Sequence, residues 1–112
     1  MFDIWKRSLD VFAYYDRPVL FTTIFPNGKT VLVVLSDENS VAETWIAVYV
    51  SAKTIIKLRM GAVDFYTVFR NERWLWKIVR PWEGGEVTCN PILASQVPDD
   101  DLPDKGERLK YP

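Results

Sequence analysis

Two residue types on which much protein chemistry depends are scarce in this chain of 112 residues: it has no histidine and one cysteine, Cys89. Without histidine, the chain cannot build a Ser–His–Asp or Cys–His site or a metal site with imidazole ligands. A single cysteine excludes an internal disulfide and a thiolate cluster. We therefore predict no catalytic, metal-binding or cofactor-binding residues, and a protein that is not an enzyme.

Long hydrophobic runs and net charge are also missing. No apolar run is longer than that of Trp45–Val50, whereas a membrane-spanning helix needs about 20 apolar residues. The first residues mix charges with hydrophobic side chains, unlike a signal peptide. Fourteen Lys and Arg against 15 Asp and Glu leave a net charge of -1, so overall basicity does not point to nucleic acid. These absences predict a cytoplasmic protein without a membrane span.

The rest of the composition is typical of one folded domain. Hydrophobic residues make up 48% of the chain, at a length that suits one compact domain and not two. We predict an α+β fold, an antiparallel sheet of four or five strands with two short helices packed on one face. Residues 1–93 form the globular domain in this prediction, and residues 94–112 form an irregular tail rich in Pro and Asp.

A β-hairpin is the clearest local signal. Pro18–Phe25 and Thr30–Ser36 are rich in Val, Ile, Leu, Phe and Thr, and an Asn-Gly pair lies between them. Asn and Gly tolerate the positive φ angles that a type I′ turn needs. Val31–Leu35 and Trp45–Val50 are apolar at every position, which predicts central strands that are covered on both faces.

Two consecutive short helices are predicted after these strands. The Ser51 hydroxyl can cap a helix that begins at Ala52, and Gly61 stands where that helix would end. A second helix is predicted over Val63–Phe69, where apolar residues recur every three or four positions. Only this part of the chain is long enough for a crossover, so the strands should otherwise be antiparallel neighbours.

The ends of the domain carry weaker patterns. In Arg73–Arg80 the pattern of residues alternates with the two-residue period of a strand, so we predict a strand there. Glu86–Asn90 predicts a last strand that Pro91 interrupts. Apolar residues between Phe2 and Phe12 are spaced as on an amphipathic helix. From Leu9 onward they also alternate as in a strand, so both alternatives stay open.

Charge is distributed unevenly although its sum is near zero. From Lys53 to Arg80 seven basic residues stand against two acidic ones, and from Pro81 onward seven acidic residues stand against three basic ones. Basic residues interleaved with aromatic ones are typical of proteins that bind single-stranded nucleic acid. Nucleic-acid binding is therefore the alternative function, and six residues would carry it: Lys53, Lys57, Arg59, Arg70, Arg73 and Lys77.

The acidic end of the chain can instead neutralise the basic segment. We predict that Asp99–Asp101 lies near part of the Lys53–Arg80 surface, in the same chain or in a neighbouring copy. Leu102 and Tyr111 should dock on apolar surface, because the segment has too few hydrophobic residues for a core of its own.

Aromatic residues are more frequent than a domain of this size requires, with five Trp among 112 residues. Trp and Tyr dominate the energetics of protein interfaces, and a sheet with helices on one face needs a cover for its other face. We expect the N-terminal segment, the tail or a partner to supply that cover. The main prediction is a non-enzymatic protein-interaction or accessory module, with a protein partner or a second copy of itself in a homodimer. Its anchors would be Phe2, Trp5, Trp74, Trp76 and Trp82.

Two polar groups carry the third and weakest alternative, a histidine-free enzyme. Tyr14-Tyr15-Asp16 could present a phenol and a carboxylate to a ligand, although Asp before an X-Pro turn usually bonds to nearby backbone amides. The carboxylates that could gather near one strand end are Asp37, Glu38, Glu43 and Asp64. Their spacing matches no calcium loop and no glycosidase pattern, so a solvated loop is the simpler interpretation.

Short motifs across the chain resemble one family. In chain order they are Tyr14-Tyr15-Asp16, Pro18-Val19-Leu20-Phe21, Leu35-Ser36-Asp37-Glu38, Trp45, Val50-Ser51, Gly61, Asp64, Val97-Pro98 and Leu102-Pro103. The sequence is similar in these motifs to a family of small uncharacterised bacterial proteins, a domain of unknown function with a Tyr-Tyr-Asp-x-Pro hairpin. Arg17 stands where a glycine or another small residue is expected. The resemblance implies a bacterial or phage source and an intracellular accessory role, and it carries over no catalytic or binding residue.

Overall fold

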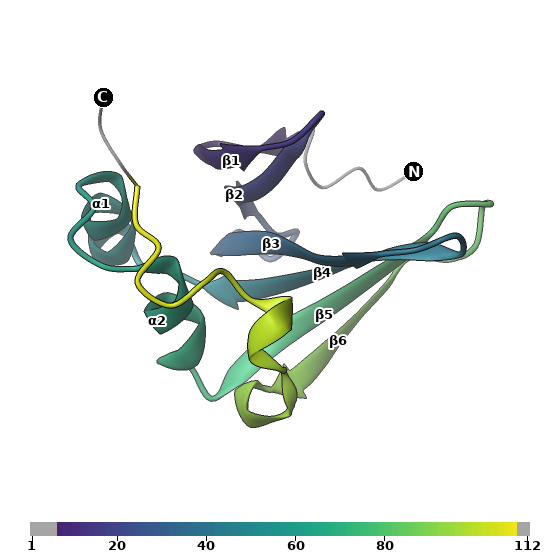
Figure 1. Cartoon of the computed structure of the whole chain (residues 1–112). Helices are drawn as coiled ribbons and strands as arrows, with labels where there is room; N and C mark the ends of the chain where they lie inside the picture. Colours follow the sequence, from purple (N-terminus) through teal and green to yellow (C-terminus); the bar gives the residue numbers. More distant parts are fainter. Residues whose placement is uncertain (1–6, 110–112) are drawn as a thin grey trace.

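Six consecutive antiparallel strands form one sheet in the order β1–β2–β3–β4–β5–β6 (Figure 1). The computed structural model describes residues 7–109. The strands are β1 Val11–Tyr14, β2 Pro18–Ile24, β3 Thr30–Glu38, β4 Ala42–Tyr49, β5 Trp74–Pro81 and β6 Thr88–Leu93. Two helices, α1 Ala52–Arg59 and α2 Phe65–Arg70, connect β4 to β5. Two short 3-10 helices, η2 Ala94–Gln96 and η3 Asp99–Asp101, follow β6.

The predicted class is confirmed in its main features, an antiparallel sheet with two short helices, and the protein is mostly β. The predicted number of four or five strands is roughly right, and β1 at one edge brings the number to six. Over Val11–Tyr14 the strand alternative was therefore right and the helical one wrong. The central placement of β3 and β4 and the hairpin between β2 and β3 are confirmed. The predicted type I′ turn is wrong, because Gly28 has a positive φ of 83° and Asn27 does not.

Both edges of the sheet are poorly suited to pairing with another strand. The register of β1 against β2 is irregular on either side of Ala13. In β6, Pro91 lies opposite Trp76 within the strand and does not end it, which corrects the sequence-based boundary. Proline has no N–H for the ladder, so it is tolerated in an edge strand with its nitrogen turned outward. Irregular pairing and an edge proline both hinder strand addition.

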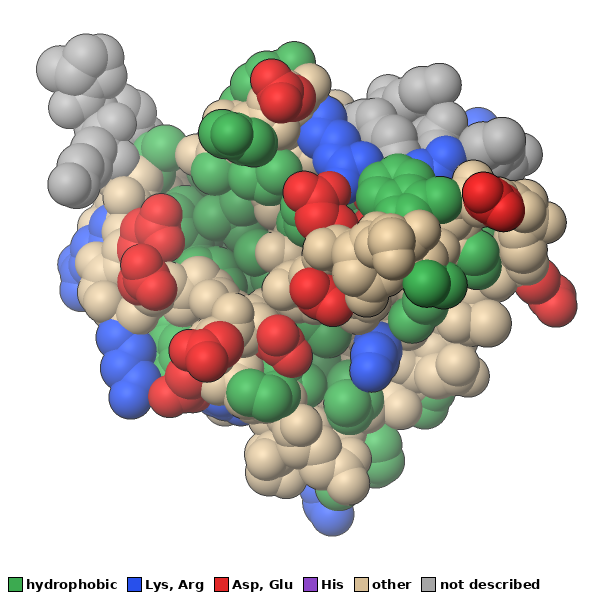
Figure 2. Space-filling view, turned by 45° about the vertical axis from the view of Figure 1, so that its right-hand side comes forward, with side chains coloured by type: hydrophobic (Ala, Val, Ile, Leu, Met, Phe, Trp, Pro, Cys, Tyr) green, Lys and Arg blue, Asp and Glu red, His purple; other side chains and the backbone are tan. Residues whose placement is uncertain are grey.

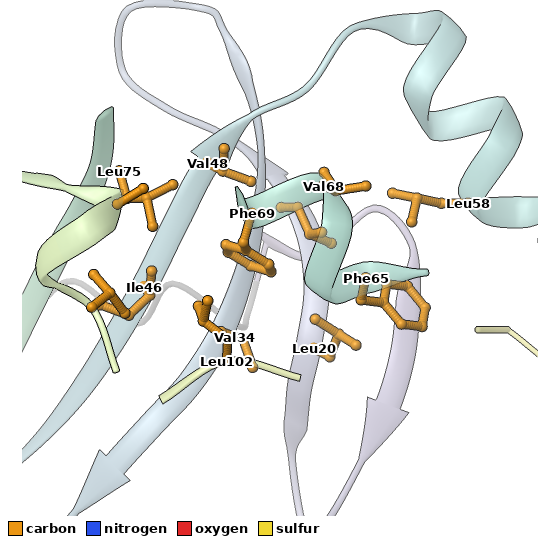
Figure 3. Packing of buried hydrophobic residues seen from close by; sticks show 13 residues of the cluster. Leu20, Val34, Ile46, Val48, Leu58, Phe65, Val68, Phe69, Leu75 and Leu102 are labelled. Carbon is orange, nitrogen blue, oxygen red and sulfur yellow. The ribbon is translucent and has the colours of Figure 1, made fainter. Parts of the chain in front are cut away.

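One face of the sheet carries the helices. Alternate residues of the strands, such as Leu32 and Val48, point to this face and pack against α1 and α2. Figure 3 shows Phe65, Val68 and Phe69 of α2 directed at the strands. The Ser51 hydroxyl accepts a hydrogen bond from Thr54 N (3.1 Å), as the predicted cap requires. Neither helix of the described chain is long and apolar enough to cross a membrane.

The opposite face holds a separate aromatic cluster. Phe21 and Trp45 are fully buried there, with ring centroids 5.6 Å apart in an edge-to-face arrangement. Trp76 packs edge-on against Phe25 and Tyr49 at 6.4 and 5.9 Å. Because β3 and β4 contribute to both clusters, their unbroken apolar sequence is explained by burial on both faces.

The chain after β6 folds back over the helix face; we call residues 94–109 the strap (Figure 1, yellow-green to yellow). Ala94, Val97 and Leu102 are buried in the same cluster as the helices. Docking of Leu102 on apolar surface is thus confirmed, whereas Tyr111 lies outside the described residues. The strap covers the face that the helices already cover, and not the aromatic face.

We expect Gly61→Ala to lower the free energy of unfolding by about 1–3 kcal/mol, because Gly61 holds a left-handed φ that side chains adopt at a cost. Its φ is +66°, and an added Cβ would lie 2.8 Å from the Leu109 carbonyl oxygen of the strap. Gly106→Ala is the matched control: its φ is +82°, with no atom within 4 Å of the added Cβ. If urea denaturation gives the same loss of unfolding free energy for both variants, the close approach of the Leu109 carbonyl oxygen adds nothing to the effect at Gly61.

Candidate functional site

Three turns meet at one end of the sheet, which we call the hairpin end: the turns between β1 and β2, β3 and β4, and β5 and β6. In an up-and-down sheet every second turn returns to the same end. Contacts confirm the proximity, since Arg17 of the first turn forms an ion pair with Glu38 of β3 at 2.9 Å. The Trp82 N–H, at the start of the third turn, donates to the Val41 carbonyl of the second at 3.0 Å.

A buried carboxylate lies beneath these turns. The side chain of Glu43 has no solvent exposure, and its two oxygens face two arginines. Arg17 Nη1 lies 2.7 Å from Glu43 Oε2, and Arg80 Nη1 lies 3.2 Å from Oε1. An ionised carboxylate is tolerated without solvent only where such partners neutralise it. Glu43 and its two arginines therefore tie β4 to β5 and to the β1–β2 turn.

Strand register sets up this arrangement. Glu43 of β4 is paired with Arg80 of β5 on one side and with Glu38 of β3 on the other. An irregularity in β3 between Leu35 and Asp37 shifts the register by one residue. Without that shift Asp37 would stand opposite Glu43, and Glu38 would not share Arg17 with it.

Aromatic rings complete the cluster. The Arg17 guanidinium lies 5.5 Å from the Trp45 ring centroid and 5.6 Å from that of Trp82. The Arg80 guanidinium lies 5.9 Å from the Trp82 ring. Trp82 is fixed in turn, because its indole N–H donates to the Asn39 carbonyl at 2.6 Å. The attraction between a guanidinium group and an aromatic ring is stronger when the guanidinium group has lost part of its hydration.

Exposed apolar side chains surround this cluster. Tyr15 is 78% exposed and Val41 71% exposed, and Tyr14 and Trp82 are exposed as well. Figure 2, in which the right-hand side of Figure 1 comes forward, shows hydrophobic side chains at the surface between acidic ones. The hairpin end thus combines buried ion pairs with large side chains that are exposed to solvent.

The predicted interaction anchors are distributed over the molecule. Trp82 lies at the hairpin end, while Trp74 is exposed at the start of β5, at the other end of the sheet. Trp76 is only half-buried and packs into the aromatic face. Phe2 and Trp5 lie outside the described residues. Sequence analysis thus indicated one residue of the hairpin end as an anchor and missed the arginines beneath it.

The polar groups considered for catalysis do not converge. The Tyr14 hydroxyl donates to the Asp16 carbonyl at 3.1 Å, a contact local to the turn. Glu38 and Glu43 share Arg17, whereas Asp64 precedes α2. Hydrogen bonds from the Thr67 side chain and from Gly106 N–H lower the pKa of Asp64.

Neither a cluster of metal ligands nor a reactive thiol is found among residues 7–109. No three Cys, Asp or Glu side chains of residues 7–109 come together in a way that could hold a metal ion. Desolvation raises the pKa of the Cys89 thiol on the edge strand β6, so its nucleophilic thiolate form is scarce near neutral pH.

The six basic residues predicted to bind nucleic acid differ in their exposure and in their partners. Lys53 and Lys57 are exposed one turn apart on α1. Arg73 is exposed just before β5, and Lys77 is exposed in the middle of β5. The other two form pairs within the chain. Arg59 binds both oxygens of the Asp10 carboxylate at 3.1 and 2.8 Å, and Arg70 binds the strap.

Arg70 is the main polar contact between α2 and the strap. Its guanidinium donates to the carbonyls of Ala94 and Val97 and to the Asp99 carboxylate, the last at 2.6 Å. The Tyr66 hydroxyl also donates to Asp99, at 2.7 Å. The prediction that the acidic segment lies against the basic one is therefore confirmed for Asp99, within the same chain. Hydrogen bonds from Tyr66 and Arg70 lower the pKa of Asp99 to about 2.

Together these features define a small six-stranded antiparallel domain whose hairpin end is held by a buried ion-pair cluster and whose C-terminal strap is held by an arginine. The chain belongs to the family of unknown function DUF6575, whose sequence profile matches residues 6–110. This finding confirms that the resemblance pointed to a domain of unknown function. Searches of curated proteins and of solved structures found no match.

We expect Glu43→Gln to lower the free energy of unfolding by about 3–5 kcal/mol, because a neutral amide removes the buried charge that two largely buried guanidinium groups share. Urea denaturation measures the change. Glu86→Gln, an exposed site in the β5–β6 turn, is the control and should change stability by less than about 0.5 kcal/mol. A loss below about 1 kcal/mol for Glu43→Gln would mean that the pairs behave like exposed ones.

The lowered pKa of Asp99 predicts how the strap responds to acid. A carboxyl whose pKa falls from about 3.9 when unfolded contributes stability above that pH and loses it as the pH falls further. For Asp99 most of the loss should occur between about pH 4 and its folded pKa of about 2. The stability difference between wild type and Asp99→Asn should therefore be largest above pH about 4 and shrink toward pH 2.

Urea midpoints measured across that pH range test this expectation. Asp100→Asn, an exposed neighbour on the same 3-10 helix, controls for the general effect of net charge. A difference for Asp99→Asn that stays constant with pH would contradict the role given to its ionised carboxylate.

Proposed function

We propose that this protein is a non-enzymatic interaction module that associates with a second copy of itself through the hairpin end. The observation that carries the proposal is the exposure of Tyr14, Tyr15, Val41 and Trp82 around a cluster of buried ion pairs. Tyr and Trp are enriched among the residues that dominate interface energies. Anchors on a rigid base lose little conformational freedom on binding, which favours affinity.

The charges of the hairpin end support a second copy as the partner. Acidic residues lie at the same end of the sheet as the two arginines: Glu38 of β3 is paired with Arg17, and Glu83 lies exposed in the β5–β6 turn. A two-fold interface brings the same patch together twice, so it requires a surface that is complementary to itself. A patch with both signs of charge around apolar anchors meets that requirement. Because both sheet edges hinder strand addition, side chains would make the contact.

Nucleic-acid binding has weaker support. Arg59 and Arg70 are held by carboxylates of the same chain, and the remaining four cations lie on two separate segments, α1 and residues 73–77.

From the motifs that resemble a bacterial family we further propose a bacterial origin and an accessory role in the cytoplasm.

Sedimentation equilibrium over a wide concentration range tests the proposal. The double variant Tyr15→Ser/Val41→Ser removes two exposed anchors without touching the ion pairs, and it should weaken association at least about tenfold. The matched control is Ile56→Ser/Met60→Ser, which removes two exposed apolar side chains from the α1 side of the molecule.

A wild-type protein that stays monomeric at high concentration would reject self-association. Equal weakening by the two double variants would show that general hydrophobicity, and not the hairpin end, drives it. Anisotropy of a labelled single-stranded oligonucleotide at low salt separates the alternative, because phosphate contacts must weaken steeply as salt rises.

A further inference from the structure

A groove of about 320 Å³ lies between the β1–β2–β3 part of the sheet and the strap. Apart from Glu107 its lining is apolar: Ala13, Val19, Leu20, Val34, Leu35 and Pro103. Leu20 and Val34 are cross-strand partners that are almost completely buried, so they form a fixed floor. The volume is at the small end of the range of about 300–1,000 Å³ that is typical of ligand pockets. Such a groove accommodates one or two aliphatic side chains better than a large cofactor.

The strap gives this groove an acidic border. Residues 94–109 contain five acidic and two basic residues. Asp99 is paired with Arg70 and with Lys105, and Arg108 donates to the Gly61 carbonyl, so the acidic border consists of the other carboxylates of the strap. Glu107 lines the groove itself, and Asp104 is exposed next to Pro103. Figure 2 shows an apolar hollow on this side of the molecule with acidic side chains around it and few basic ones near.

We propose that this groove binds a cationic segment of another protein, which inserts an aliphatic side chain between β2–β3 and the strap and places Lys or Arg beside it. The apolar lining favours the aliphatic anchor. Carboxylates around it attract cations and repel nucleic acids and anionic lipids, which excludes those two classes of partner. The irregular edge strand β1 does not offer a regular ladder, so the segment is held by side chains and charge and not by strand addition.

The proposal is separate from association through the hairpin end, since it involves different residues and a different partner. The probe is a fluorescein-labelled peptide of nine residues, with two leucines among lysines. Two comparison peptides replace the leucines by serine or the lysines by glutamate. The leucine–lysine peptide should bind at low salt at least tenfold more tightly than either comparison peptide, and its binding should weaken as salt rises.

Two variants test the location. Ala13→Phe fills the groove, and Glu107→Lys reverses the charge on its wall while leaving the backbone bonds of Glu107 in place. Each should weaken binding of the leucine–lysine peptide at least tenfold. Glu86→Lys makes the same charge change in the β5–β6 turn and should leave binding within twofold. Thermal unfolding checks that the variants are folded, and Glu107→Lys keeps the test valid if Ala13→Phe is not.

The outcomes separate this proposal from the previous one. The variant Tyr15→Ser/Val41→Ser should bind the peptide like wild type even where it no longer self-associates. Equal binding of the serine–lysine peptide would show attraction by charge alone and would overturn the groove as an apolar site. Equal loss for Glu86→Lys and Glu107→Lys, or no binding of the leucine–lysine peptide, would overturn it as well.

Discussion

The ionised carboxylate of Glu43 is the group on which the hairpin end depends, because its side chain is shut off from water. Removing a carboxylate from solvent is costly, and only close cationic partners offset that cost. Arg17 and Arg80 supply the charge, and each comes from a different part of the sheet. The condition that both must reach Glu43 fixes where the β1–β2 turn and the end of β5 lie. The positions of the exposed side chains on these turns follow from that constraint.

The strap depends on a similar arrangement in a more solvated place. Arg70 gathers two backbone carbonyls and the Asp99 carboxylate on one guanidinium, a geometry that lysine cannot provide. Burial of Val97 and Leu102 supplies the hydrophobic contribution, while Arg70 and Tyr66 select the position. The strap in turn forms one wall of the groove, so the acidic border of the groove follows from how the strap is held.

Local sequence signals predicted much of the fold. The hairpin signal at Asn-Gly, the Ser51 cap and the apolar runs of β3 and β4 act over a few residues, and the elements that they predict are found where expected. The turn type was not predicted correctly, since only Gly28 of the pair has a positive φ. The edge strand β1 was ambiguous because its apolar residues fit two periods, and tertiary pairing decides between them. The site was not predictable in the same way, since the pairing of Glu43 with Arg80 depends on register and on the shift in β3. One signal was present: Glu43 shares the side-chain direction of buried Trp45, so its carboxylate required a partner.

The distribution of charge gives the two proposed contact regions different selectivity. At the hairpin end both signs of charge are present around apolar anchors, which suits a patch that meets its own copy. At the groove the local excess is acidic, which suits the cationic segment proposed there. Both sheet edges hinder strand addition, so both proposals rely on contacts between side chains. A net charge near zero thus combines a hairpin end with both signs of charge and a groove with an acidic border.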